Sequence, residues 1–187
     1  TMDVTVRENG NRNIVKKFRR IVICSGPRDA INVYFHSDAH VCFPHSETVE
    51  IPPKTIHALR KIAQEVFILY DIDETGRKRA NRLAMRFLDL KVLYLPKQLS
   101  QITSSRTGKP CKDAEEYFNY YPAMLKNTQH FYGSSINEHF LNMLCNAKPM
   151  MFWKRKDQVR NKGKEDEFIE PKFTLLIDRT NQLLSAC

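Results

Sequence analysis

The chain has 187 residues, of which 42% are hydrophobic and 27% charged, and its net charge is +9 with a pI of about 9.4. This composition is typical of a soluble globular protein, and no apolar run approaches the ~20 residues that cross a bilayer. The polar N-terminal segment lacks the apolar stretch of a secretory signal. The five cysteines are scattered and form no CxxC pair, which argues against a disulfide scaffold and favours a reducing, cytoplasmic setting.

The basic balance makes polyanions the expected partners, with nucleic acid first. The first residue is Thr rather than Met, which suggests that the chain is part of a longer protein.

The predicted elements alternate along the chain. Residues 1–19 are expected to form a lead-in of no assigned structure. After them, "RRIVIC" predicts a buried strand that stops at Gly26, and "PRDAINVYF" predicts a helix beginning at Pro27. The rest of the series is a short strand near Val41–Phe43, a helix in "PPKTIHALRKIAQ", a strong strand in "EVFILYDID", a helix in "TGRKRANRLAMRFLDL", a strand in "KVLYLP", and a helix in "DAEEYFNYY" that stops near Pro122.

This alternation predicts an α/β fold with a mostly parallel, four-stranded sheet flanked by helices. We expect the main domain to span residues 20–125. Residues 126–187 are expected to be a mainly helical extension or the start of a following domain. A basic stretch in this extension, Lys154 to Lys164, is interpreted as a solvated linker.

Two aspartates, Asp71 and Asp73, follow the strongest strand. In α/β sheets, ligands bind beyond the carboxyl ends of the strands, so chemistry is expected here. Two neighbouring carboxylates repel, and a divalent ion relieves that repulsion. Hard oxygen ligands suit Mg²⁺ or Mn²⁺, which shares its coordination shell with water and phosphate.

Gly76, three residues after Asp73, gives the turn its freedom and lies where the next helix begins. Basic residues then recur on that helix at a spacing of four, in Lys78, Arg82 and Arg86, with Arg77 beside them. Such a stripe can follow a phosphate backbone, although a solvated helix face produces the same pattern.

The stretch "ILYDIDETGRKRANRLA" resembles the DxDxxG motif of TOPRIM domains, which occur in bacterial-type primases, topoisomerases and some nucleases. The flanks are most similar to primases and primase–helicases of phages and of mobile elements in Bacteroides-like bacteria. "KVLYLP" followed by "CKDAEEYF" resembles the primase pattern in which a Lys-Asp pair opens a helix. The resemblance covers about Arg20 to Tyr121. It implies that Asp113 is a third metal ligand beside Asp71 and Asp73, and that Lys112 is its basic neighbour.

One position departs from the family. The first TOPRIM motif is a Glu-Gly pair followed by Asp, and this chain has "CSGPRDA": Gly26 and Asp29 match, but Ser25 stands at the glutamate position. A serine has neither the pKa nor the charge of a general acid or base. Three interpretations stay open: a domain without catalysis, a substitute carboxylate such as Glu47 or Glu74, or a mutation.

The resemblance implies Mg²⁺-dependent nucleotidyl transfer, as in a primase or primase–helicase. The expected partners are a single-stranded DNA template, nucleoside triphosphates and a helicase domain or subunit, with no membrane partner. Phosphate contacts are expected from Arg77, Lys78, Arg82, Arg86 and Lys112. Because of Ser25, the sequence leaves open whether the domain is an enzyme.

Two alternatives to primer synthesis are a non-catalytic module for nucleic-acid binding or partner docking, and a TOPRIM nuclease or topoisomerase that cleaves phosphodiesters.

Two further patterns have weaker support. In an extended segment, four side chains would share one face and could bind zinc: His36, Asp38, His40 and Cys42. The spacing of these residues matches no zinc signature. The tyrosines Tyr120, Tyr121 and Tyr132 are candidates for stacking on single-stranded bases, although aromatics at helical spacing are more often core.

Overall fold

The computed structural model describes residues 2–8, 11–45, 49–126 and 135–151, all of which fall in one compact unit, Thr1–Trp153. Glu47, Tyr132, the basic stretch from Lys154 to Lys164 and the rest of the predicted extension after residue 151 lie outside the described residues. None of the described helices has the length and hydropathy needed to cross a membrane.

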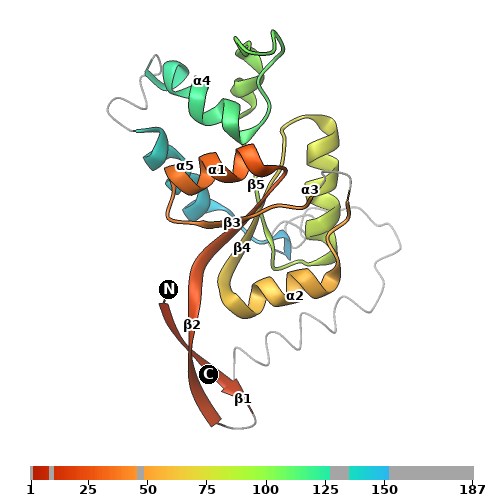
Figure 1. Ribbon diagram of the computed structural model, residues 1–187, viewed down its shortest axis with the longest axis vertical. Coiled ribbons are helices and arrows are strands. Elements are labelled where there is room, and N and C mark those ends of the chain that lie inside the picture. Colours follow the sequence, from red (N-terminus) through yellow and green to blue (C-terminus); the bar gives the residue numbers. More distant parts are fainter. Residues whose placement is uncertain (1, 9–10, 46–48, 127–134, 152–187) are drawn as a thin grey trace, which may run out of the picture. The chain divides into compact units, whose positions relative to one another are not determined.

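The strands are β1 (Met2–Glu8), β2 (Asn11–Cys24), β3 (His40–Cys42), β4 (Ala63–Leu69) and β5 (Lys91–Leu93). The helices are α1 (Pro27–His36), α2 (Pro53–Ile62), α3 (Glu74–Arg86), α4 (Ala114–Lys126) and α5 (Ile136–Asn146), and a 3₁₀ turn covers Lys97–Gln101. Four strands pair in parallel in the order β3-β2-β4-β5, and helices flank the sheet. The predicted α/β fold with a parallel four-stranded sheet is therefore confirmed (Figure 1).

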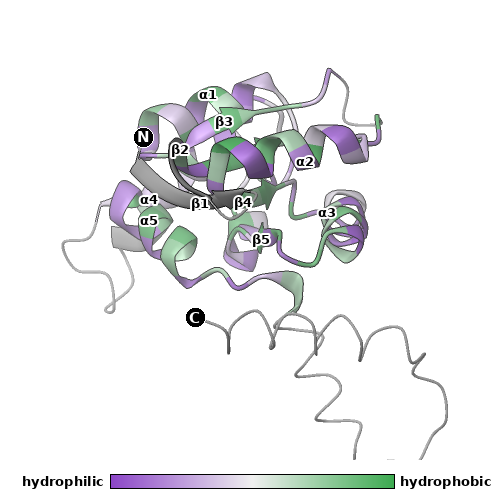
Figure 2. Cartoon of the chain, turned by 90° about the horizontal axis from the view of Figure 1, so that it is seen from below, coloured by the Kyte–Doolittle hydropathy of each residue, from purple (hydrophilic) through white to green (hydrophobic). Residues whose placement is uncertain are grey.

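Alternate residues of the central strands point to opposite faces of the sheet, as the two-residue period of a strand requires. Val22 and Phe67 pack with α1, α4 and α5, whereas Ile21 and Ile68 pack with α2 and α3. Hydrophobic and hydrophilic residues alternate around α1 and α2, as expected for helices with one packed side (Figure 2). The sheet thus has a hydrophobic layer on each face.

The lead-in contains a strand that the sequence analysis did not predict. β1 pairs antiparallel with the first part of β2, from Met2 opposite Lys17 to Glu8 opposite Asn11. The dipeptide Asn9–Gly10 between the strands is the sequence signal that was missed, because Asn-Gly is a preferred pair for two-residue hairpin turns.

Two other details differ from the expectation. Pro122 does not end its helix, since α4 continues to Lys126 with the proline inside it. The buried side chains of Tyr117, Phe118 and Tyr121 hold this helix in the core, and their packing outweighs the hydrogen bond that proline removes.

Helix α5 also belongs to the same core. Phe140 and Leu144 are fully buried there, and a capping box between Ser135 and Glu138 fixes the start of the helix.

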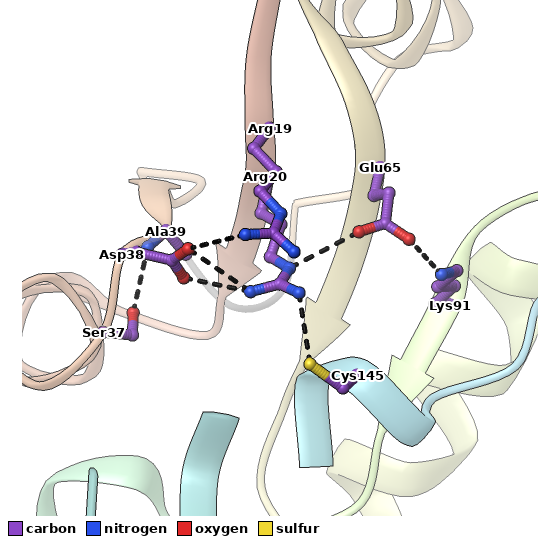
Figure 3. Close-up of polar contacts among 8 residues, drawn as sticks. All are labelled: Arg19, Arg20, Ser37, Asp38, Ala39, Glu65, Lys91 and Cys145. Atoms are coloured by element: carbon purple, nitrogen blue, oxygen red, sulfur yellow. Dashed lines mark hydrogen bonds and ion pairs between the residues drawn. The ribbon is translucent and has the colours of Figure 1, made fainter. Parts of the chain in front are cut away.

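At the amino-terminal end of the parallel strands, Arg20 organises a polar network (Figure 3). Its buried guanidinium donates to Asp38 at 3.1 Å, to Glu65 at 3.4 Å and to the sulfur of Cys145 at 3.3 Å. Glu65 also pairs with Lys91. The network therefore joins the parallel part of β2 to β4, β5, α5 and the turn before β3.

Candidate active site at the carboxyl edge of the sheet

The strand order places the site. After β2 the chain adds β3 on one side, and later adds β4 on the other side of β2. Between β2 and β4 lies the switch point where ligands of open α/β sheets bind. Cys24 and Leu69 are register partners at the ends of these strands, so Ser25 and Asp71 come out at the same edge.

Asp71 and Asp73 converge on a single cation, the ammonium of Lys112. The Lys112 Nζ lies 2.8 Å from Asp71 Oδ2 and 2.8 Å from Asp73 Oδ2. Asp71 is 9% exposed, whereas the side chain of Asp73 is 39% exposed. The two hydrogen bonds to these carboxylates raise the pKa of Lys112 above its usual range. The two carboxylates thus share one positive charge, which in this structure is the Lys112 ammonium, and the predicted divalent ion stays a prediction.

Asp73 is also the N-cap of α3. Its Oδ1 accepts from the Gly76 N–H at 2.8 Å, which uses one of the free amides at the helix start. Burial alone would raise the pKa of Asp73, but the Gly76 N–H and Lys112 together lower it. Asp73 is therefore held ionised.

Position 76 has no room for a side chain, so the residue there must be glycine. A Cβ at position 76 would lie 2.4 Å from the backbone oxygen of Asp71 and 2.9 Å from its backbone nitrogen. By contrast, a Cβ at Gly26 would meet no atom within 4 Å. Gly76 lets the start of α3 approach the turn that carries Asp71.

The segment before α4 supplies Lys112. The Ile72 N–H donates to the Lys112 carbonyl at 2.9 Å, which fastens this segment to the aspartate turn. Asp113 precedes α4 and accepts from the Glu116 N–H at 2.8 Å.

Burial raises the pKa of Asp113 to about 7, with further contributions from the charges of Asp29, Glu116 and Asp71. Its role as a metal ligand stays a prediction: over the described part of the chain, no group of three or more His, Cys, Asp or Glu side chains is placed to hold one metal ion. The same absence of a metal-holding group applies to the predicted zinc cluster of His36, Asp38, His40 and Cys42. His36 stacks on Phe118, and Asp38 pairs with Arg20.

Ser25 lies between two buried carboxylates. Its Oγ is 2.5 Å from Asp29 Oδ2 and 3.1 Å from Asp71 Oδ1. Burial raises the pKa of Asp29, which also accepts from the Glu115 N–H at 3.1 Å. A hydroxyl carries one hydrogen, so it donates to one of the two carboxylates at a time. Ser25 therefore connects Asp29 to Asp71.

Glu74 does not take the place of the missing glutamate in this structure. Its side chain is 81% exposed and forms an ion pair with Lys78 at 2.6 Å. The carboxyl group nearest to Ser25 is that of Asp29, which the family motif also contains.

The carboxylates open into a cleft of 1150 Å³ and a smaller pocket of 270 Å³. Asp71, Asp73 and Lys112 line both. Basic side chains on the larger cleft come from α1, α3 and the segment between β5 and α4, and they are Arg28, Arg77, Lys97, Arg106, Lys109 and Lys112. The site is thus an acidic edge facing a basic wall.

The predicted phosphate-binding residues divide into two groups. Arg77 and Lys112 line the cleft. Lys78 pairs with Glu74, Arg86 pairs with Glu50, and neither they nor Arg82 lines the cleft or the smaller pocket. Helix geometry explains the separation: consecutive residues point about 100° apart, which turns Lys78 away from the cleft, and Arg86 lies nine positions along α3 from Arg77.

Sequence reasoning missed the side of the cleft that the segment after β5 forms. Tyr94, Lys97, Arg106 and Lys109 line the cleft, and none was predicted as a site residue. The available signal was the basic segment "KQLSQITSSRTGKPCK" between two elements. Of the predicted stacking tyrosines, Tyr121 is buried in the core and the Tyr120 hydroxyl bonds to Ser105.

Comparison with protein families found no match, and comparison with curated proteins found none. Among solved structures, the chain is similar to one of bacteriophage T7 lagging-strand DNA polymerase interacting with the primase domains of two gp4 subunits bound to an RNA/DNA hybrid and dTTP. The TM-score is 0.45 and the identity 20%, over 74% of this chain and 67% of that chain. A likeness of this degree says nothing about function.

Proposed function

We propose that this chain carries a TOPRIM-like domain of the primase type, which binds Mg²⁺ or Mn²⁺ between Asp71 and Asp73 and acts in nucleotidyl transfer on nucleic acid. The observation that carries the proposal is the convergence of both aspartates on one ammonium group at the switch point of the sheet. The resemblance of the DxDxxG stretch and of the Lys112–Asp113 pair to primases supports the same assignment.

The donor set fits a magnesium ion. Mg²⁺ in phosphate-handling sites is held by one or two carboxylates and completes its shell with water and phosphate oxygens. Asp71 and Asp73 supply two carboxylates whose oxygens already face one positive charge. When bound, the ion would neutralise triphosphate charge and help to position a primer hydroxyl.

The side chains of this domain have separate roles in the proposal. Arg77 and Lys112, which both line the cleft, contact phosphates. The ammonium of Lys112 balances the two carboxylates before a metal binds, and it is then free to turn to a phosphate. The substrates are a single-stranded DNA template and nucleoside triphosphates, and a helicase domain or subunit is the expected partner.

A second candidate is a binding module without catalysis, and Ser25 is the observation that favours it. Ser25 takes the position of the family's glutamate, and its hydroxyl is engaged with Asp29 and Asp71. Such a domain would keep the fold and the basic wall for docking on nucleic acid or on a helicase partner.

The experiment has two parts. Magnesium titration followed by thermal denaturation is carried out on the wild type, on Asp71→Asn and on the control Glu50→Gln, whose exposed carboxylate lies outside the cleft. We expect the melting temperature of the wild type and of Glu50→Gln to rise with magnesium. Asp71→Asn should show no rise.

The second part measures template-dependent incorporation of labelled nucleotide by the wild type and by Ser25→Glu. Incorporation by the wild type supports the primase. Incorporation only by Ser25→Glu supports the binding module, because the restored glutamate then supplies the lost function. Nicking of plasmid without nucleotides would instead identify a nuclease, and a melting temperature that ignores magnesium would overturn the metal site.

A further inference from the structure

The wall of the cleft formed by the segment after β5 presents an exposed aromatic ring. Tyr94 is 46% exposed and lines the cleft, while Tyr117 and Tyr121 are buried in the core. The Tyr94 hydroxyl donates to Asn81 Oδ1 of α3 at 2.5 Å. This bond restricts the side chain, so that the ring is held at the cleft and loses little freedom when a ligand stacks on it.

Several cations on this cleft have no acidic partner among the described residues. Arg28 and Arg106 pair with Glu115 at 3.4 and 3.2 Å. For Arg77, Lys97 and Lys109, by contrast, no ion pair to a described carboxylate is present. Unneutralised cations around a cavity favour an anionic ligand with several charges.

The floor of the cleft is apolar, with Ala80, Val92 and Leu95 among its lining residues. An apolar floor, an aromatic ring and a cationic rim together suit bases joined by phosphates. The volume of 1150 Å³ exceeds the ~300–1,000 Å³ of sites for small molecules, so there is room for more than one nucleotide.

We propose that this cleft binds single-stranded nucleic acid, with a base stacked on Tyr94 and with the neighbouring phosphates contacted by Arg77 of α3 and by Lys97 and Lys109. The strand then leads along the cleft to Asp71 and Asp73. The inference rests on the proposed function for its choice of nucleic acid as ligand. The binding itself requires no metal ion.

The test is fluorescence anisotropy of a labelled oligothymidylate of about six nucleotides with the full chain, in the presence of EDTA. Tyr94→Ala should weaken binding about tenfold, because one stacked base is lost. Tyr94→Phe keeps the ring but loses the bond to Asn81 that holds it, so it should weaken binding by no more than about threefold. The control Tyr34→Ala removes a tyrosine of α1 that is 57% exposed and does not line the cleft, and it should have no effect.

The salt dependence tests the phosphate contacts. The slope of log K against log salt should become less steep by about 0.7 in Lys97→Gln and again in Lys109→Gln, since each lysine neutralises one phosphate of a single strand. Equal binding by the wild type and Tyr94→Ala, or unchanged slopes in both lysine variants, would overturn the proposal. So would dTTP binding as tightly as the oligonucleotide, because the ligand would then be a mononucleotide.

The two proposals fail separately. Asp71→Asn should lose the magnesium response and keep oligonucleotide binding in EDTA. If the wild type shows no magnesium response but binds the oligonucleotide through Tyr94, the metal site is wrong and this inference stands. If magnesium raises the melting temperature but the oligonucleotide does not bind, the metal site stands and this inference is wrong.

Discussion

The α-carbon of Gly76 lies so close to Asp71 that a Cβ there would stand 2.4 Å from the Asp71 backbone oxygen. Backbone atoms cannot move aside as a flexible side chain can. The distance between these two residues therefore explains why a glycine follows the second aspartate of the motif by three positions.

The first prediction concerns this contact. Gly76→Ala should lower the free energy of unfolding by about 3 kcal/mol, because the methyl group forces the start of α3 away from the aspartate turn. Urea denaturation measures the change. The matched control is Gly26→Ala, where the backbone is extended (φ −154°) and a Cβ meets nothing within 4 Å, so the loss should stay below about 1 kcal/mol. Equal losses would contradict the steric explanation.

The second prediction concerns Lys112. Lys112→Gln removes the ammonium that balances Asp71 and Asp73, and we expect a loss of about 1 kcal/mol without metal, since the side chain is 48% exposed and its ion pairs are screened. Magnesium should then bind more tightly than to the wild type, because it no longer competes with an internal cation.

Isothermal titration calorimetry measures this affinity. Lys109→Gln is the control, since Lys109 lines the same cleft without pairing with either aspartate. Weaker magnesium binding to Lys112→Gln than to Lys109→Gln would show that lysine and metal do not share the carboxylates.

The third prediction is a pH dependence. Burial raises the pKa of Asp113 to about 7 from a reference of 3.8, so between these pH values the folded chain holds a proton that the unfolded chain releases. The stability that this proton contributes is fully present below the reference pKa of Asp113. It is lost as the pH rises through the pKa of Asp113 in the folded chain. Asp113→Asn keeps the helix cap and removes the titration. The difference in unfolding free energy between wild type and variant should therefore shift by about 2 kcal/mol in favour of the variant from pH 4 to pH 8.

Urea denaturation at a series of pH values gives this difference. The lowered pKa of Asp73 has the opposite effect on stability, but it is present in both proteins and therefore cancels. Asp113→Ala serves as the comparison, because it removes the titration and also the cap, at a cost of about 1 kcal/mol. A difference between wild type and Asp113→Asn that does not change with pH would disprove the raised pKa.

The fourth prediction compares two neighbouring arginines of β2. Arg20→Met should cost about 2–3 kcal/mol, because the buried guanidinium joins Asp38, Glu65 and Cys145 (Figure 3). The cost stays moderate since Asp38 and Glu65 remain partly solvated.

Arg19→Met should cost less than about 0.5 kcal/mol, because Arg19 is 56% exposed and its ion pair with Asp38 is 3.8 Å long. Guanidinium chloride denaturation of both variants decides the matter. Similar losses would mean that the network does not stabilise the fold.

Local sequence patterns were sufficient for most of the elements. The segments "EVFILYDID" and "TGRKRANRLAMRFLDL" predict a strong strand and a helix, and the structure has both as β4 and α3, with Ala80, Leu83 and Ala84 buried. The failures were also local. The polar lead-in contains β1, for which no strand is predicted, and α4 continues past Pro122 because its side chains pack in the core.

The chemistry available at one edge of the sheet follows from local sequence, because Asp71, Asp73 and Gly76 are neighbours in the chain. Which distant groups meet these residues depends on the tertiary fold. A backbone hydrogen bond from Ile72 to Lys112 brings the Lys112 side chain to both aspartates. The Ser25 hydroxyl connects Asp29 to Asp71. Likewise, Tyr94 and the basic wall become a surface only when the segment after β5 folds beside α3. Contacts between residues so far apart in the chain depend on how the strands are ordered and paired, and no periodicity within a single segment contains that information.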